Sequence, residues 1–185
     1  METLITDGME PWQNLLLVHQ FAIDELRVKL SNLDEEFRLI QDYNPIEHIR
    51  YRVKKPSSII EKLERIGLEP TIENAKNHVF DIAGIRIICA FTADIYTMLD
   101  IFMQHPEFEV VQVKDYIKYP KPNGYKSLHV HISYPVYLSK SVERVRVEIQ
   151  LRTIAMDFWA SIEHKIYYKF REKAPTMIQA ELKGC

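Results

Sequence analysis

Apolar and polar side chains alternate at every step from Val145 to Arg152. A period of two is that of a β-strand with one apolar and one polar face. The polar face includes Glu148, and a strand fixes the direction of a carboxylate, which suits it to hold a metal ion or take a proton. An amphipathic helix is predicted to follow over residues 154–170. We therefore take Glu148 as the centre of a candidate site.

The N-terminal part of the chain shows the helical period instead. Apolar residues recur at steps of three and four between Pro11 and Ile40, and Asn44–Pro45 ends the stretch. This pattern predicts one long helix, or two in series with a break near Ser31–Asn32. Residues 1–10 carry no pattern and are expected to be mobile.

The rest of the chain mixes strands with helices, which indicates an α/β or α+β domain. Ser58 followed by Glu61 has the form of a capping box for a helix that starts at Pro56, and Gly67 is expected to end that helix. Residues 71–80 are predicted as loop or short helix. The remaining predictions are strands at 46–53, 85–91, 108–116, 128–134 and 145–153, a helix at 92–105, a loop at 117–127 and a second C-terminal helix after Pro175.

The composition narrows the class of protein. A chain of 185 residues, 46% hydrophobic and 27% charged, suits one soluble domain with helical extensions. The net charge of −2 excludes the overall basic field of a sequence-independent nucleic-acid binder, so any anion site must be local. Two cysteines argue against a disulfide framework, and Cys89 is expected to be a buried thiol. The sequence has neither a membrane-spanning apolar run nor a signal peptide, so a cytoplasmic protein is expected.

Basic residues gather before the helix predicted to start at Pro56. Backbone N–H groups at a helix N-terminus, the helix dipole and nearby cations together favour a polyphosphate. A solvated basic helix start is the alternative interpretation. The cluster contains Arg50, Arg52, Lys54, Lys55, Ser58, Lys62 and Arg65.

A second cluster surrounds the start of the predicted strand at 85–91. Asp81 precedes this strand, and Gly84 permits a close approach of backbone, so Asp81 could hold a hard cation. Alternatively, Asp81 is a turn residue bonded to nearby backbone. Arg86 lies within an otherwise apolar strand, where a guanidinium requires a carboxylate, a phosphate or an aromatic face as its partner.

A third cluster lies between two predicted strands, where lysines gather with a glycine and a tyrosine. Such a loop suits the phosphates and ring of a nucleotide, although lysine-rich turns are commonly only solvated. Its residues are Lys114, Lys118, Lys121, Asn123, Gly124, Tyr125, Lys126, Ser127 and His129.

The helix after Glu148 forms the fourth cluster. Asp157 could accept two hydrogen bonds from the N1–H and N2–H edge of guanine, although an exposed helix carboxylate is the alternative. Zinc fits the spacing of the seven histidines poorly, because His129 and His131 share a strand face but are only two ligands. The predicted polar face is Asp157, Ser161, His164 and Tyr168, and the predicted core stripe is Ala155, Phe158, Trp159, Ile162 and Ile166.

Taken in this order, the clusters resemble the synthetase domain of the RelA/SpoT-type (p)ppGpp synthetases. Within this family, the resemblance is greatest to the stand-alone small alarmone synthetases of bacteria. The resemblance runs from about Pro45 to Phe170. Each motif alone is modest, and their common order is specific. The motifs are Arg52-Val-Lys54 with Ser58 and Lys62, Asp81–Arg86, Lys121–His129, Val147–Thr153 and the helix Ala155–Tyr168.

The resemblance implies an α+β fold with a nucleotidyltransferase-like mixed sheet of about five strands between helices. It implies transfer of pyrophosphate from ATP to the 3′-hydroxyl of GDP or GTP in the stringent response, with Mg²⁺ as cofactor. Asp81 would bind the metal, and Glu148 would help to hold it or activate the 3′-hydroxyl, while Arg52 and Arg86 would sandwich adenine. The other implied ligands are Lys54, Ser58, Lys62 and Lys114 for ATP, and Lys121, Gly124, Tyr125, Lys126, Ser127, His129, Gln150 and Asp157 for GDP or GTP, with Tyr125 stacked on guanine.

The resemblance also implies an organisation of the chain. An N-terminal helical extension is expected at 1–44, the synthetase domain at 45–171 and a C-terminal helical tail at 172–185, without a hydrolase or a regulatory domain. A homo-oligomer, by resemblance a tetramer, is expected. Two alternatives stay open: a nucleotidyltransferase with another acceptor such as RNA ends, and an inactive nucleotide- or RNA-binding module.

Overall fold

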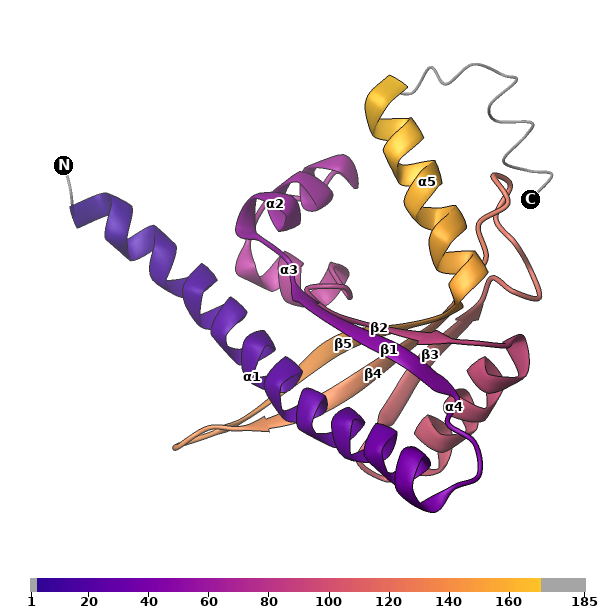
Figure 1. The fold of residues 1–185 in the computed structure, drawn as a ribbon. Helices are drawn as coiled ribbons and strands as arrows, with labels where there is room; N and C mark the ends of the chain where they lie inside the picture. Colours follow the sequence, from indigo (N-terminus) through magenta and orange to yellow (C-terminus); the bar gives the residue numbers. More distant parts are fainter. Residues whose placement is uncertain (1–2, 171–185) are drawn as a thin grey trace.

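The computed structural model describes residues 3–170, and side chains from residue 11 to residue 166, as helices around a five-stranded mixed sheet (Figure 1). The strand order is β1-β2-β5-β4-β3, and the central pair of β2 with β5 is parallel while the other neighbours are antiparallel. The strands are β1 (Ile46–Val53), β2 (Ala83–Cys89), β3 (Glu109–Asp115), β4 (Leu128–Tyr137) and β5 (Val142–Thr153).

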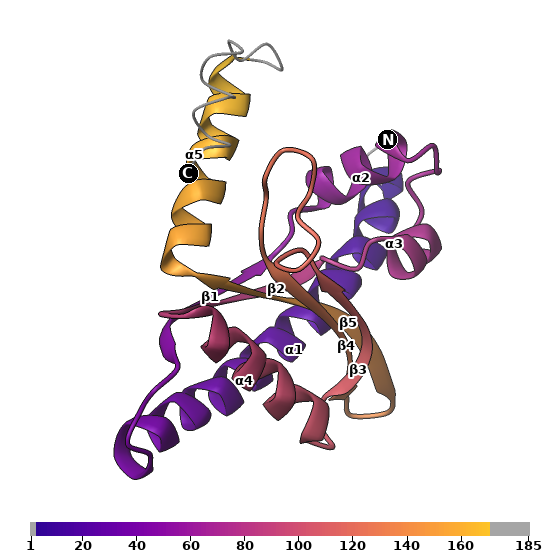
Figure 2. The same cartoon turned by 90° about the vertical axis from the view of Figure 1, so that its right-hand side faces the viewer.

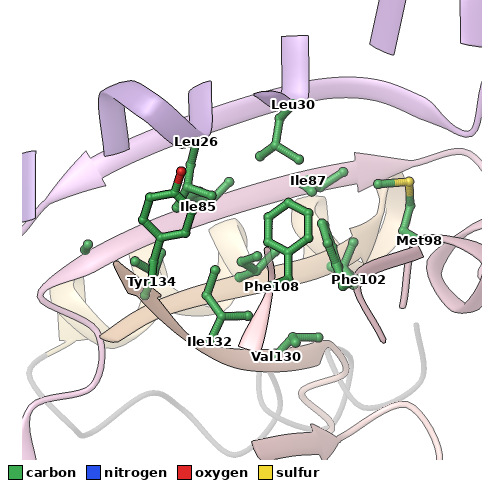
Figure 3. Packing of buried hydrophobic residues seen from close by; sticks show 14 of the residues in the cluster. Leu26, Leu30, Ile85, Ile87, Met98, Phe102, Phe108, Val130, Ile132 and Tyr134 are labelled. Atoms are coloured by element: carbon green, nitrogen blue, oxygen red, sulfur yellow. The ribbon is translucent and has the colours of Figure 1, made fainter. Parts of the chain in front are cut away.

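Two helices cover one face of the sheet and form the main core with it. Leu26 and Leu30 of α1 (Thr3–Ile40) and Phe102 of α4 (Thr92–Gln104) pack against strand residues such as Ile85 and Ile87 (Figure 3). All five side chains are essentially fully buried. Burial of one such side chain contributes about 1.5–3 kcal/mol, so α1 is an integral part of the core that supports the sheet.

The other helices border the opposite face. Ile59 of α2 (Pro56–Arg65) and Ala75 of α3 (Ile72–His78) pack with Leu15 of α1 in a separate cluster. Helix α5 (Ile154–Phe170) leaves the end of β5 on the side away from α1 and α4, and the β3–β4 loop extends on the same side of the sheet (Figure 2). We call this side of the sheet the polar face, after its residues Arg52, Gly84, Arg86, His129, His131, Glu148, Gln150 and Arg152.

The structure confirms the α+β class and the mixed sheet, and each predicted strand is present, β1 with the predicted ends and the others with shifted ends. The predictions about α1, however, need correction. The helix begins at Thr3 rather than near Pro11, and it continues through Ser31–Asn32 without a break. Leu30 is buried and Phe37 packs on the core, so tertiary packing overrides the weak helix propensity of Ser and Asn.

The predicted capping box at Ser58 is wrong as well. Helix α2 begins at Pro56 as expected, but its N-cap is Lys55, which makes no side-chain capping bond. Proline suits the first helical position because its φ is fixed and its missing N–H needs no partner there. Ser58 therefore lies within the first turn. Gly67 follows the helix with φ 76°, as its predicted role requires.

Cys89 is a buried free thiol, as predicted. Among the described helices, none has the length and apolar character that crossing a membrane requires. The predicted tail at 172–185 and the helix predicted after Pro175 lie outside the described residues, and the boundary between residues 44 and 45 stays a prediction.

Candidate functional site

Glu148 lies at the middle of the polar face. In the register of the sheet it is paired with Gly84 of β2 on one side and with His131 of β4 on the other. Strand pairing therefore joins segments that are distant in sequence into rows across one surface. The adjacent row contains Arg86, Gln150, His129 and Lys114.

Five side chains form a closed ring of hydrogen bonds that includes Glu148. His129 Nδ1 lies 2.9 Å from Glu148 Oε1, and Gln150 donates to Oε2 at 2.7 Å. Arg152 donates to Gln150 at 3.0 Å and to the Tyr125 hydroxyl at 2.8 Å. The Tyr125 hydroxyl lies 2.8 Å from His129 Nε2 and closes the ring. Both oxygens of Glu148 are thus held in direction before any ligand binds.

Asp157 joins this ring to α5. Its Oδ1 accepts hydrogen bonds from Arg86 at 3.1 Å and from Arg152 at 2.9 Å, and the residue is buried. The predicted core stripe of α5 is therefore wrong in part, because Ala155 and Phe158 are exposed, Phe158 to 67%. The two ion pairs with the sheet determine which side of the helix faces inward.

A second carboxylate, Asp81, lies just before β2 among cations. It forms ion pairs with Lys54 and Lys62, the latter at 2.6 Å, and Arg52 lies 3.9 Å away. Burial raises the pKa of Asp81, but the hydrogen bonds and charges of Lys54 and Lys62 outweigh burial and lower the pKa to about 2. Asp81 is therefore ionised at neutral pH.

Glu148 is ionised for a similar reason. Burial raises its pKa, but the hydrogen bond and charge of His129 and the hydrogen bond from Gln150 outweigh burial and lower the pKa to about 2. The charge of Asp81 acts on Glu148 in the opposite direction and raises that pKa. The two carboxylates, distant in sequence, therefore lie within each other's field.

A cleft of about 200 Å³ opens beside Glu148 toward β1 and β2. Arg52 and Arg86 border it from neighbouring strands. Gly84 lies beneath the Arg52 side chain, because a Cβ at this position would come within 3.3 Å of Arg52 Nε. The glycine thus permits the arginine to lie close against the sheet, which agrees with the close approach expected from the sequence.

The β3–β4 loop borders the other side of the ring. Tyr125 is half-buried, and Lys121 Nζ lies 5.1 Å from the centre of the Tyr125 side-chain ring. Gly124 has φ 90°, a conformation that disfavours other residues, and a Cβ there would lie 3.4 Å from Trp159 Cζ2. Lys126 is exposed. The loop thus places Tyr125, with Lys121 beside its ring, next to His129 of the hydrogen-bonded ring.

Two predicted residues lie apart from this group. Ser127 is fully buried, and its hydroxyl donates to the carbonyl oxygen of Leu151 at 3.2 Å. Ser58 lies in the first turn of α2. Lys114, by contrast, is half-buried on β3 and is paired with His129 in the sheet.

Two residues of the site were not among the predicted ones. Arg152 bonds Asp157, Tyr125 and Gln150, and His131 lies 3.7 Å from Glu148 Oε1. The strand alternation was the signal available for both, since Arg152 shares a face with Glu148 and His131 with His129. Of the residues described, His129, His131 and Glu148 form a group whose ligand atoms all lie within 4.8 Å of one another.

Residues 51–173 match a sequence profile described as the region found in RelA and SpoT proteins. The chain is 54% identical to the GTP pyrophosphokinase YwaC of Bacillus subtilis over 175 residues, which cover 95% of this chain and 83% of that protein. It also resembles the structure of B. subtilis small alarmone synthetase 1 bound to its product pppGpp, with a TM-score of 0.86 and 36% identity over 93% of this chain and 87% of that one. For the same enzyme bound to AMPCPP, the TM-score is 0.78, with 32% identity over 93% and 86% of the two chains.

Proposed function

This chain belongs to the RelA/SpoT family, and we propose that it is a (p)ppGpp synthetase that transfers pyrophosphate from ATP to the 3′-hydroxyl of GDP or GTP. One observation carries the proposal: Glu148 lies between the cleft bordered by Arg52 and Arg86 and the loop that presents Tyr125. Two nucleotides bound on either side would bring their reacting atoms together at Glu148. The relatives bound to AMPCPP and to pppGpp support this assignment of substrates.

The donor ATP is proposed to bind on the β1–β2 side. Its adenine would lie between the guanidinium groups of Arg52 and Arg86, which favour flat aromatic faces. Lys54 and Lys62, which now neutralise Asp81, would meet the phosphates. Ser58 and Lys114 are proposed as further phosphate ligands.

The acceptor is proposed to bind on the side of the β3–β4 loop. Tyr125 would stack on guanine, and Asp157, which Arg86 and Arg152 hold, would read its N–H edge. The remaining proposed contacts to GDP or GTP are Lys121, Gly124, Lys126, His129 and Gln150. The contact expected from Ser127 is not retained, because this side chain is fully buried and donates to Leu151.

Mg²⁺ is the proposed cofactor, and the side chains fit it. Asp81 and Glu148 are ionised carboxylates within each other's field, and hard cations prefer such oxygen ligands. Bound there, Mg²⁺ would neutralise phosphate charge and polarise the transferred group. Lys54 and Lys62 would pass from Asp81 to the phosphates, so the positive charge around the site would be retained.

In the proposed reaction, the 3′-oxygen forms a bond to the β-phosphorus of ATP. The bond from that phosphorus to the bridging oxygen of the α-phosphate breaks, AMP leaves, and the hydroxyl proton is released. Such transfers depend mainly on alignment and charge neutralisation. Glu148 would orient the hydroxyl, since a carboxylate with a pKa of about 2 is a weak base at neutral pH.

The proposal is tested by incubating the protein with labelled ATP, Mg²⁺ and either GDP or GTP and separating the products. We expect guanosine tetraphosphate from GDP and guanosine pentaphosphate from GTP, with AMP released in equal amount. Binding of both nucleotides without turnover would instead favour an inactive binding module. Labelled product on RNA ends would favour the other nucleotidyltransferase reaction.

Replacing Tyr125 with alanine is expected to raise the KM for the acceptor about tenfold or more and to change the KM for ATP much less. The reason is that stacking of a base on an aromatic side chain contributes about 1–3 kcal/mol. Steady-state kinetics with each substrate varied in turn would measure both constants.

Tyr125→Phe keeps the aromatic ring for stacking and removes only the hydroxyl that bonds His129 and Arg152. It should therefore raise the acceptor KM less than Tyr125→Ala does. The matched control is Tyr119→Ala, because Tyr119 lies in the same loop and is 69% exposed. Equal changes in both KM values would contradict the stacking role.

We propose a cytoplasmic homo-oligomer, by resemblance to the family a tetramer. Sedimentation of the intact protein would measure the state directly, and a monomer at micromolar concentration would contradict this part of the proposal.

A further inference from the structure

His131 is a buried imidazole that the proposed reaction does not use. It is 6% exposed, and neither of its ring nitrogens has a hydrogen-bond partner. Its Nε2 lies 3.7 Å from Glu148 Oε1, and the Phe80 ring lies nearly perpendicular to it, with 5.9 Å between the ring centres. Buried polar groups normally have a hydrogen-bond partner, because an unpaired one costs about 1–3 kcal/mol of folding stability. A ligand that bound a nitrogen of this imidazole would remove that cost.

The two neighbours of His131 on the polar face offer the rest of a metal-ligand set. His129, His131 and Glu148 are all buried, and their ligand atoms lie within 4.8 Å of one another. The sheet register pairs His131 with Glu148 across β4 and β5, so the rigid scaffold holds the group together. Two imidazoles and one carboxylate are a ligand set that Zn²⁺ uses in proteins, with water in the fourth position.

The surroundings of this group suit a metal site. The Tyr125 hydroxyl at 2.8 Å from His129 Nε2 can accept the proton of that nitrogen while Nδ1 faces Glu148. Metal-binding histidines usually have such an outer partner, which fixes the tautomer. A cavity of about 280 Å³ borders His131.

The nearby charges partly balance. Lys114 and Arg146 disfavour a cation, while Glu148 supplies a negative charge directly and Asp81 lies within electrostatic range of His131. The ligands themselves therefore decide the choice of metal. Imidazole is a ligand preferred by borderline cations, whereas Mg²⁺ prefers oxygen.

We propose that His129, His131 and Glu148 form a binding site for a borderline divalent cation of the Zn²⁺ and Co²⁺ class. The site differs in ligand type from the oxygen site proposed for Mg²⁺ and shares Glu148 with it. Binding requires no nucleotide, so it can be tested independently of the proposed synthetase reaction.

The test is titration of the intact, metal-free protein with Co²⁺ in the absence of nucleotides, followed by visible absorption and calorimetry. We expect one Co²⁺ per chain with the visible bands of a low-coordinate, nitrogen-containing site. His131→Val should abolish the bands and weaken binding by more than about 100-fold, since a direct ligand contributes more than the outer partners that change affinity 10–100-fold. Asp81→Asn is the matched control and should retain the bands.

Thermal unfolding would establish that His131→Val is folded, which we expect because valine suits a strand and removes an unpaired polar group. His131→Gln is the second variant should valine fail to fold, and it should also lose the bands. Absence of the bands from the wild-type protein, or equal Co²⁺ binding by wild type and both His131 variants, would overturn the proposal. His131 takes no part in the proposed reaction, so synthesis and Co²⁺ binding test different hypotheses. A wild-type protein that binds Co²⁺ but makes no alarmone would overturn the proposed function alone, and one that makes alarmone without the Co²⁺ bands would overturn this inference alone.

Discussion

Replacing Glu148 with glutamine is expected to lower kcat for alarmone synthesis by about 10³-fold or more while the protein stays folded. Glutamine keeps the shape of the side chain and an oxygen that faces His129, but it removes the negative charge that would hold Mg²⁺ and orient the 3′-hydroxyl. The measurement is the rate of product formation at saturating ATP and acceptor, which separates a loss of chemistry from a loss of binding.

We also expect Glu148→Gln to remain folded. Gln150 donates to Glu148 Oε2 at 2.7 Å, and an amide nitrogen at that position would face a second donor. One lost hydrogen bond of this kind costs about 1 kcal/mol, too little to unfold a domain of this size. Glu143→Gln is the matched control, because Glu143 lies on the same strand in an exposed ion pair with Lys76. Near-normal turnover in Glu148→Gln would reject the central role of this carboxylate.

Asp81→Asn is expected to reduce kcat by a similar factor and to lower stability as well. Its carboxylate joins Lys54 and Lys62, whose side chains are only 17% and 28% exposed. Without it, burial would lower the pKa of Lys54 further, because Asp81 now opposes that effect. We expect a loss of about 1–3 kcal/mol in unfolding free energy, measured by denaturant titration. Asp100→Asn, at an exposed position on α4, is the control for the loss of a carboxylate, and synthesis by Asp81→Asn at the wild-type rate would exclude Asp81 as a metal ligand.

The same carboxylates predict how stability depends on pH. The pKa values of Asp81 and Glu148 in the folded protein are about 2, below the value near 4 of an unfolded chain. Their stabilising effect is therefore complete above the unfolded value and is lost as the pH falls through the folded value. We expect the unfolding free energy to decline between about pH 5 and pH 2, and to decline less steeply in Asp81→Asn. An unchanged slope in that variant would contradict the assignment.

Local patterns predicted the strands and the chemistry of their faces well. The alternation from Val145 to Arg152 placed Glu148 on a polar strand face, and the apolar run from Ile85 to Phe91 predicted β2. Partners across the sheet were harder to infer, because the order of strands and their register are tertiary properties. The contact of Arg152 with Tyr125 and the nearness of His131 to Glu148 depend on that register and were not predicted from the residues.

Helix ends and helix faces show where local patterns fail. Ser58 and Glu61 have the spacing of a capping box, but Pro56 suits the first helical position and leaves Ser58 inside α2. In α5, the apolar positions predicted a core stripe, yet Asp157 faces inward because two arginines of the sheet bind it. A charge that has partners in the folded protein can outweigh a hydrophobic period.

The last strand in the sequence, β5, lies at the centre of the sheet between β2 and β4. A nascent chain that has not yet released Val142–Thr153 from the ribosome can form only two separate strand pairs, β1 with β2 and β3 with β4. Long-range pairing of this kind forms slowly, because the intervening chain must first be brought together. Glu148 therefore takes its place between Gly84 and His131 only after translation of the central strand, and an unfinished chain lacks the polar face on which the proposed reaction depends.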